Sequence, residues 1–406
     1  MDAKVQFDGD PRPGGSEGTP IPQNLDFNRR WKRQLADASG RLAMTDSKRR
    51  IAVGLMLLVY CFVLYLVFDF AFTALTMGDP RRYRVFDYRY HHSLIANFDG
   101  YDYWGNNRYR LLTNSLGFKD AAVREIAKVS PNRRILLIGD SFTEGIGLPF
   151  EQTFAGKLYS AGQNRKEKIE FLNAGVASYS PSIYFKKIQT LLSDGFHFDE
   201  VIVFSDLSDV TDEASSYFCI DDDPKYRAFC DPADAKPPAS KKSFVSSHLK
   251  VTDAIGDWIE KKVDPPKPPL PLDPFRTEWI YPNPSVARYQ PLGVEGGVAR
   301  SIQNMTALAN LLEQKKIPLT IVVYPWPAQL ARDDRDNRQV QIWSKFCKDH
   351  CKEFVNLFPV FLAERDKAPN WYDRLFVPGD FHYSEPGNEI ISRAMQDRLL
   401  RNATTN

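Results

Sequence analysis

Short, mostly apolar runs alternate with segments of helical periodicity through most of the chain after residue 130. The runs of strand length cover residues 135–138, 169–172, 201–204 and 317–325. The segments in which apolar residues recur at helical spacing cover residues 150–158, 181–192, 299–314 and 388–400. Strands buried on both faces form continuous apolar runs, and strands that alternate with helices pair in parallel through right-handed crossovers. The pattern therefore predicts an α/β fold, a three-layer α/β/α sandwich around a parallel sheet.

The longest apolar stretch of the chain covers residues 51–77. Its first 18 residues carry no charge, and its length suits a bilayer core about 30 Å thick. A buried core helix is seldom apolar on all faces over this length, and a cleaved signal peptide has a much shorter region before its apolar core. We therefore expect one transmembrane helix at 51–77, with Asp69 close to a membrane interface.

Residues 1–50 are rich in glycine, proline and charge, and we expect a disordered tail because they lack the apolar content of a core. Eight Lys and Arg residues lie between Arg29 and Arg50 against two acids, which favours a cytoplasmic N-terminus. Four arginines soon after the span, at positions 81, 82, 84 and 89, weaken this bias. The expected topology is a single-pass membrane protein whose main domain is periplasmic or extracellular.

Two segments interrupt the regular alternation. Residues 78–130 are rich in aromatic side chains, and we expect them to form a packed lead-in before the main domain at 131–406. A proline-rich insert at about 212–297 is longer than an ordinary connection, and we expect it to cover the functional side of the domain, with one helix at 251–263. Its aromatic residues suit either stacking on a sugar ring or a small core of the insert itself. These residues are Phe218, Trp258, Phe275 and Trp279.

Composition narrows the classes of function. The chain has 406 residues, 43% of them hydrophobic, which is enough for one large domain with appendages or for two small domains. Its 53 basic and 51 acidic residues leave a formal net charge of +2, and no basic stripe is interleaved with aromatic residues. This balance provides no electrostatic basis for binding nucleic acid, so we exclude that class.

The cysteines suggest the compartment. Cys61 lies within the apolar stretch, and the other four form two close pairs, Cys219 with Cys230 and Cys347 with Cys351. Close pairs in an even number suit local disulfides in an oxidising compartment. The alternative is a four-thiolate metal site, but neither spacing is C-x-x-C and the two pairs lie far apart in sequence. We expect two disulfides and no metal site.

The candidate nucleophile is Ser141. The apolar run at 135–138 ends at Gly139-Asp140, as a strand does at the rim of a buried parallel sheet, and this leaves the serine at that rim. Nearby glycines permit tight backbone geometry, so that N–H groups can point at whatever binds above the hydroxyl. On its own, however, G-D-S favours an ordinary strand-to-helix turn in which Asp140 or Ser141 caps a helix.

A second motif, Asp380-Phe381-His382, distinguishes between these alternatives. A serine hydroxyl is a weak nucleophile until a base accepts its proton, and that base needs a third group to fix its tautomer. The motif supplies an imidazole and a carboxylate just before the helical segment at 388–400. The sequence therefore predicts a catalytic triad of Ser141, His382 and Asp380.

Together these motifs resemble those of the SGNH, or GDSL-like, hydrolases. The run G-D-S-F-T-E-G at 139–145 is similar to the first block of that family, N-A-G at 173–175 to the second, and D-F-H at 380–382 to the last. The run N-S-L-G-F-K at 114–119 resembles the lead-in of membrane-attached members that handle acyl groups on extracellular polysaccharides. The resemblance covers most of residues 109–400 and implies a flavodoxin-like sandwich with serine-based ester chemistry.

The resemblance also implies an oxyanion hole, with the backbone N–H groups of Ser141 and Gly175 as two donors. In the family the third donor is the asparagine of a G-x-N-D block after the third strand, whereas this chain has D-L-S-D at 206–209. Ser208 occupies the position of that asparagine. Its hydroxyl can donate a hydrogen bond, although it is shorter and less constrained than an amide.

The expected function is that of a membrane-anchored serine esterase or O-acyltransferase acting on acyl esters, above all acetyl, of a cell-envelope or extracellular polysaccharide. Its expected partners are the acylated carbohydrate, the membrane through one helix and, for a transferase, an integral-membrane acyl donor protein. No metal or organic cofactor is needed for this chemistry. Hydrolysis and transfer both stay open, because the sequence does not identify the acyl acceptor. A non-catalytic glycan-binding or scaffold component is the alternative, favoured by the missing asparagine and opposed by the complete triad.

Overall fold

The computed structural model describes residues 46–76, 83–104, 107–220, 248–263 and 276–400, except 283 and 285, together with a few isolated positions. Most of the expected tail at 1–50, and Phe275 of the insert, lie outside the described residues. The chain divides into two units, Met1–Phe68 and Asp69–Asn406. Helix α2 (Asp46–Thr76) begins in the first unit and ends in the second.

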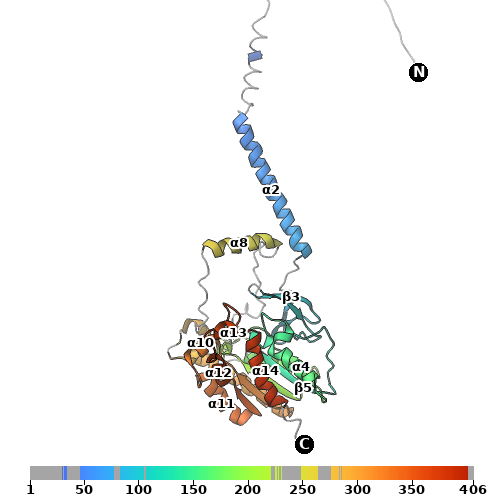
Figure 1. Ribbon diagram of the computed structural model, residues 1–406, viewed down its shortest axis with the longest axis vertical. Helices are drawn as coiled ribbons and strands as arrows, with labels where there is room; N and C mark the ends of the chain where they lie inside the picture. The colour runs from blue at the N-terminus through green and yellow to red at the C-terminus, as the bar shows by residue number, and fades with distance from the viewer. Residues whose placement is uncertain are drawn as a thin grey trace, which may run out of the picture. The chain divides into compact units, whose positions relative to one another are not determined.

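The second unit contains a parallel five-stranded sheet in the order β6-β5-β7-β8-β9. Figure 1 labels β5 of this sheet, with α4 and α14 nearby in the view. Its strands are β5 (Arg133–Gly139), β6 (Ile169–Asn173), β7 (Glu200–Ser205), β8 (Leu319–Val323) and β9 (Glu353–Asn356). Strand β5 pairs with both β6 and β7, so its carboxyl end lies inside the sheet and not at an edge. The apolar pattern predicted the first four strands of this sheet in chain order but missed β9, an edge strand that is only partly buried and has two apolar residues among its four.

The second unit also contains helices and 3-10 turns besides α8 and the end of α2. They are α3 (Ser141–Glu144), η1 (Phe150–Gln152), α4 (Phe154–Gln163), α5 (Pro181–Ser193), α6 (Asp209–Ser215), η3 (Glu278–Ile280), η4 (Val286–Tyr289), α9 (Gly293–Gln314), α10 (Pro327–Arg332), α11 (Arg338–His350), α12 (Phe358–Arg365), α13 (Trp371–Leu375) and α14 (Glu385–Leu399). The single helix expected through Phe150 and Phe154 is divided, because Thr153 caps α4 by accepting the N–H of Gly156 at 3.0 Å.

Alternate strand residues point into two separate apolar cores. In β5, Leu136 and Ile138 belong to one core and Ile135 and Leu137 to the other, and all four are fully buried. Helices α5, α9 and α11 supply apolar side chains to the first core, and α4, α12 and α14 supply them to the second. The expected three-layer α/β/α sandwich with a parallel sheet is confirmed.

The lead-in contains two antiparallel strand pairs that the apolar pattern did not predict. Strand β1 (Arg84–Asp87) pairs with β2 (His91–Leu94), and β3 (Asp99–Trp104) pairs with β4 (Asn107–Leu112). The hydroxyls of Tyr83 and Tyr109 both donate to the buried carboxylate of Asp102. A polar centre, and not only aromatic packing, therefore joins these strands.

Most of the described part of the insert packs against the sandwich. Phe218 is 8% exposed and Trp279 is 2% exposed, so neither ring is available to a sugar. Trp279 Nε1 also donates to the carbonyl oxygen of Leu207 at 2.7 Å, which ties the insert to the loop after β7. Regular structure extends into the expected insert from both sides, since α6 continues to Ser215 and α9 begins at Gly293.

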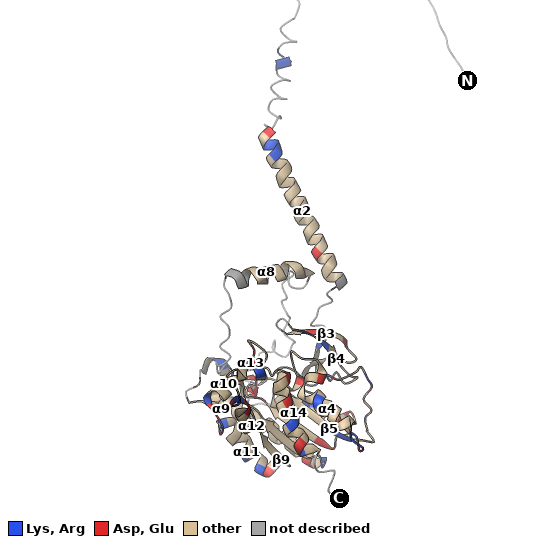
Figure 2. Ribbon diagram, viewed as in Figure 1, with Lys and Arg blue, Asp and Glu red and all other residues tan. Residues whose placement is uncertain are grey.

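Helix α2 is long and apolar enough to cross a membrane, and no other helix among the described residues meets this condition. It begins at Asp46, so the residues at 46–50, expected to be disordered, are helical. The reason is that these residues include no helix breaker, and an acid at the first position suits the positive end of the helix dipole. In the ribbon of Figure 2, α2 is coloured as acidic and then basic at its start and as acidic once more towards its other end. In the sequence these positions are Asp46, the basic residues at 48–50 and Asp69.

Both expected disulfides are present. Cys219 pairs with Cys230 and Cys347 with Cys351, with Cα atoms 5.4 and 4.5 Å apart. The fifth cysteine, Cys61, is a free thiol on α2. The two bonds are compatible with a domain that folds outside the cytoplasm.

Candidate active site

The turn that presents the serine follows β5 directly. Asp140 caps α3 by accepting the N–H of Phe142 at 3.0 Å, and Ser141 is the first residue of that helix. A Cβ atom on Gly139 would lie 2.2 Å from Thr143 Oγ1, so a side chain at this position would clash with α3. The turn therefore holds Ser141 half-buried at the carboxyl end of β5. Parallel α/β sheets bind ligands at the carboxyl ends of their strands.

A short loop between α13 and α14 presents the other two triad residues. Phe376 and Tyr383 form an antiparallel bridge that closes the loop around Asp380 and His382. Gly379 has a φ of 75°, the left-handed conformation that glycine adopts most readily. The loop can therefore turn back tightly and direct both side chains to the same side.

The three predicted catalytic side chains form one series of hydrogen bonds. His382 Nε2 lies 2.8 Å from Ser141 Oγ, and His382 Nδ1 lies 2.7 Å from Asp380 Oδ1. When Nδ1 donates to the carboxylate, Nε2 is the acceptor that faces the hydroxyl. His382 is 2% exposed and Ser141 is half-buried, so the base is shielded from water while the nucleophile stays accessible. This arrangement can accept the serine proton during attack on a carbonyl carbon.

Asp380 supplies the negative charge of the series. Its burial would raise its pKa, but hydrogen bonds from the ring and backbone of His382, the charge of that ring and a bond from Trp104 lower the pKa to about 2. Oδ1 accepts both His382 Nδ1 and, at 3.0 Å, the His382 backbone N–H, while Oδ2 accepts Trp104 Nε1. The carboxylate is therefore ionised near neutral pH, as orienting an imidazole requires.

Trp104 is a site residue that no sequence motif marks. It ends β3, and its ring meets His382 edge-on, with the ring centroids 5.1 Å apart and the planes at 90°. Its bond to Asp380 spans 276 residues of sequence. In the sequence it is one of several aromatic residues in the lead-in, so only the folded chain distinguishes it from the others.

Two further residues of the lead-in hold the turn after Ser141. Arg84 pairs with Glu144 through two bonds of 2.7 and 3.0 Å, and although burial would raise the Glu144 pKa, the Arg84 charge lowers it. Lys119 is 1% exposed, and its Nζ donates to the carbonyl oxygens of Gly145 at 2.7 Å and Leu148 at 2.6 Å. The lead-in is therefore part of the support of the site.

Gly175, the second expected oxyanion donor, packs directly against α3. A Cβ atom on this residue would lie 2.7 Å from Thr143 Cβ, so the close approach requires glycine. Its N–H donates to Asn173 Oδ1 at 3.1 Å. Donation from Gly175 to an oxyanion would therefore require this bond to be shared or broken.

Ser208, the third expected donor, lies in the loop between β7 and α6. This loop, like Ser141, follows the carboxyl end of a sheet strand. Ser208 is 3% exposed, and its backbone N–H donates to Asp206 Oδ1 at 2.7 Å. The second oxygen of Asp206 accepts Trp326 Nε1 at 2.8 Å, which fixes the loop from the neighbouring strand. Among the residues that the structure describes, no hydrogen bond joins Ser208 to Ser141 or His382.

Three buried aspartates, Asp140, Asp206 and Asp209, follow the carboxyl ends of β5 and β7. Burial raises the pKa of Asp140 and of Asp209 well above the ordinary value, and the nearby Asp206 raises both further. Ser141 Oγ lies 3.2 Å from Asp140 Oδ2, so this acid is a second acceptor for the serine proton. Because its pKa is raised, Asp140 is charged less often than an ordinary aspartate and competes less with His382.

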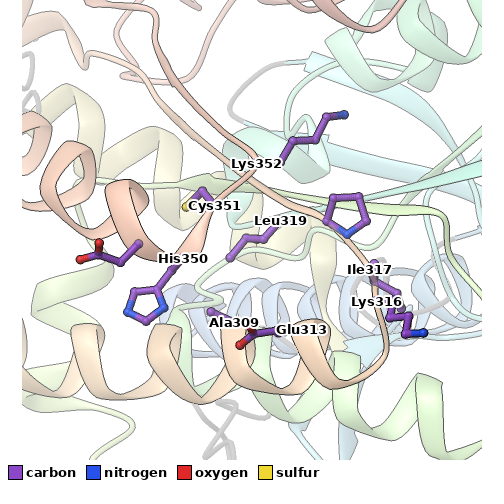
Figure 3. Close-up of a pocket in the computed structure, with 10 residues that line it drawn as sticks. Ala309, Glu313, Lys316, Ile317, Leu319, His350, Cys351 and Lys352 are labelled. Atoms are coloured by element: carbon purple, nitrogen blue, oxygen red, sulfur yellow. The ribbon is translucent and has the colours of Figure 1, made fainter.

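Figure 3 shows a surface pocket lined by the end of α9, the start of β8 and the segment before β9, with Glu313, His350 and Lys352 among its residues. These are the amino ends of parallel strands, whereas Ser141 follows the carboxyl end of β5. The pocket therefore lies at the amino ends of the strands, and the triad at their carboxyl ends. Within the described part of the chain, no group of three or more His, Cys, Asp or Glu side chains is arranged to hold a metal ion.

No protein-family model and no curated protein matches the chain. Its structure is similar to solved structures of esterases. A lipolytic protein of the G-D-S-L family from Desulfitobacterium hafniense is 15% identical, with a TM-score of 0.36, over 66% of this chain and 100% of its own. Esterase EstA from Pseudoalteromonas sp. is 12% identical, with a TM-score of 0.36, over 68% and 100%. A catalytic mutant of Axe2, an acetylxylan esterase from Geobacillus stearothermophilus, is 11% identical, with a TM-score of 0.37, over 67% and 95%.

Proposed function

We propose that this chain is a membrane-anchored serine ester hydrolase or O-acyltransferase, which acts outside the cytoplasm on acyl esters, chiefly acetyl esters, of a polysaccharide. The observation that carries the proposal is the continuous hydrogen-bonded series Ser141, His382 and Asp380 at the carboxyl end of a parallel sheet. A domain with a purely structural role has no need of an imidazole held between a hydroxyl and an ionised carboxylate.

In the proposed reaction, Ser141 Oγ attacks the ester carbonyl carbon while His382 Nε2 accepts the hydroxyl proton. The carbonyl π bond opens to an oxyanion, which N–H groups at the rim stabilise by about 3 to 4 kcal/mol for each good donor. When the intermediate collapses, His382 returns the proton to the leaving sugar oxygen, and the acyl group stays on Ser141. Asp380 keeps the imidazole in the productive tautomer and stabilises its positive charge.

The second half of the reaction decides between hydrolysis and transfer. If water attacks the acyl-enzyme, the chain is an esterase; if a sugar hydroxyl attacks, it is an O-acyltransferase supplied by an acyl donor, for which an integral-membrane protein is the candidate. The anchor α2 and the two disulfides support a place outside the cytoplasm, next to envelope glycans. The run at 114–119 supports a carbohydrate ester as substrate only through its resemblance to polysaccharide-modifying proteins.

The triad is tested by Ser141→Ala, His382→Ala and the double variant, assayed on a chromogenic acetyl ester with the full-length protein in detergent. We expect each single change to lower kcat by at least about 10⁴-fold and the double variant to be hardly worse than either, because members of one catalytic unit fail together. His350→Ala, at the pocket of Figure 3, is the matched control and should leave kcat unchanged. Full activity of Ser141→Ala would exclude the serine nucleophile.

A product analysis separates the two enzymatic outcomes. The full-length protein is incubated with the same ester and an oligosaccharide acceptor, and free acetate and acetylated sugar are measured by mass spectrometry. Acetylated sugar that depends on Ser141 identifies a transferase, and acetate alone identifies an esterase. If neither product forms while the protein still binds the glycan, the non-catalytic alternative, suggested by Ser208 in place of asparagine, replaces the proposal.

A further inference from the structure

The first turn of helix α8 (Lys250–Val263) donates hydrogen bonds to Asp69, an acid of the apolar helix α2. Asp69 Oδ1 accepts the N–H of Val251 at 2.9 Å, and Asp69 Oδ2 accepts the N–H and the hydroxyl of Thr252 at 2.7 and 2.6 Å. Backbone N–H groups in the first turn have no partner within their own helix and lie at the positive end of its dipole. Asp69 is fully buried, and it fastens the first turn of α8 to α2.

This contact has a physical reason if α2 lies in a membrane. A carboxylate in an apolar span is costly unless hydrogen-bond donors or positive charge accompany it. The first turn of α8 supplies three donors and a positive dipole end to Asp69. The start of α8 is therefore held at the depth of Asp69, near one end of the apolar stretch, where a membrane surface would be.

Beyond its first turn, α8 presents apolar side chains to solvent. Ile255 is 45% exposed, Trp258 is 62% exposed and Ile259 is 48% exposed. Residues 255 and 259 lie one helical turn apart, and residue 258 flanks them on the same side. Aliphatic side chains with a tryptophan on one side are typical of helices that lie in a membrane–water interface.

Charge does not explain the association of this helix with a partner. The sequence of α8 contains three lysines, two aspartates and one glutamate, so the charges cancel. A helix without net charge gains little from anionic lipids or from a charged protein surface, and burial of its apolar side is the main available driving force.

We propose that α8 lies in the surface of the membrane that α2 crosses, with Ile255, Trp258 and Ile259 inserted among the lipid headgroups and the upper parts of the acyl chains. The lipid surface is chosen over a partner protein because Asp69 holds α8 on the helix that spans that membrane. The insert thereby provides a second membrane contact beside the anchor. The proposal depends on the membrane placement of α2 and is independent of the catalytic activity.

The test places a nitrobenzoxadiazole fluorophore on full-length protein in phosphatidylcholine vesicles. Ile259→Cys is labelled in a Cys61→Ser background, because the other four cysteines form disulfides. Spin-labelled lipid that carries its nitroxide near the headgroup should quench this fluorophore about twofold or more, since an interfacial helix places its apolar side at that depth. Adding phosphatidylglycerol to the vesicles should leave the quenching unchanged.

Ala254→Cys is the matched control, because residue 254 is also exposed and lies about 140° around the helix from residue 259. It should be quenched much less. Equal quenching at both positions, or none at 259, would overturn the proposal; a blue-shifted but unquenched label at 259 would assign that side of α8 to a protein partner instead. A label on the native Cys61 should be quenched by lipid that carries its nitroxide deep in the acyl chain. Failure there would overturn the membrane placement of α2, and the proposal with it.

Discussion

The two carboxylate oxygen atoms of Asp380 accept hydrogen bonds from different parts of the chain. Oδ1 accepts two hydrogen bonds from His382, two residues away, and Oδ2 accepts one from Trp104, which belongs to the lead-in. A carboxylate with only one fixed oxygen can rotate about its χ2 bond and turn the imidazole away from the serine. We therefore predict that Trp104 acts as a positioning residue for the proposed triad.

Trp104→Phe should lower kcat about 10- to 100-fold, the effect expected from losing a hydrogen bond to a charged group worth roughly 1.5 to 3 kcal/mol. KM should change little, because Trp104 contacts Asp380 and His382 and the change affects proton transfer. The measurement is the steady-state hydrolysis of an acetyl ester. Trp343→Phe, in the core on α11, is the control and should lower the melting temperature without changing kcat. A kcat equal to that of the wild type would remove Trp104 from the site.

Substitutions of Ser208 test whether its hydroxyl replaces the asparagine that stabilises the oxyanion in the family that the sequence resembles. If its hydroxyl donates to the oxyanion, Ser208→Ala should lower kcat by about 100-fold or more, and Ser208→Asn should retain or raise activity. Burst kinetics with a chromogenic ester measure the acylation step directly. An unchanged burst rate in Ser208→Ala would mean that backbone N–H groups alone stabilise the oxyanion.

At the scale of secondary-structure elements, the serine turn depends on the lead-in. The buried amine of Lys119 donates to two carbonyl oxygens of the segment that follows α3. Arg84 of β1 forms an ion pair with Glu144 of α3. Burial lowers the pKa of Lys119 from 10.5 to about 8. This makes the stability of the turn dependent on pH.

The direction of that dependence follows from proton binding. Between about pH 8 and pH 10.5, Lys119 is protonated in the unfolded chain but mostly neutral in the folded chain, so the unfolded state binds more protons and stability rises with pH. We expect the melting temperature of the wild type, in detergent, to rise relative to that of Lys119→Met over this window. Parallel curves for the two proteins, measured by near-UV circular dichroism, would contradict the depressed pKa.

At the scale of the whole molecule, the prediction concerns topology. If the catalytic domain is extracytoplasmic, alkaline phosphatase fused after Asn406 should be active in intact cells, because that enzyme folds only where disulfides form. Protease added to spheroplasts should release a soluble fragment that begins near residue 80. A phosphatase fusion that is inactive although fully expressed would place the domain in the cytoplasm and contradict a role on envelope glycans.

Local sequence was sufficient where local rules decide the structure. Mostly apolar runs of strand length identified four buried strands, helical spacing identified the helices beside them, and the length of the apolar stretch identified α2. The sequence also identified Ser141, Asp380 and His382 as partners, because each stands in a short motif, and the structure joins their side chains by hydrogen bonds. Their catalytic role stays a prediction. The cysteine pairs were also correct, because closing a short loop costs little chain entropy.

Tertiary structure alone decided what depends on contacts between distant segments. Edge strand β9 lacks an apolar run, and Trp104 lies 276 residues from its partner, so neither leaves a local signal. By residue type, Trp279 was a candidate for stacking on a sugar ring, but folding buries it against the loop after β7. Asp69, an isolated acid in an apolar helix, found its role only when folding brought the first turn of α8 to it. A hydrogen bond between distant residues is invisible in sequence because its geometry exists only after the chain between them has folded.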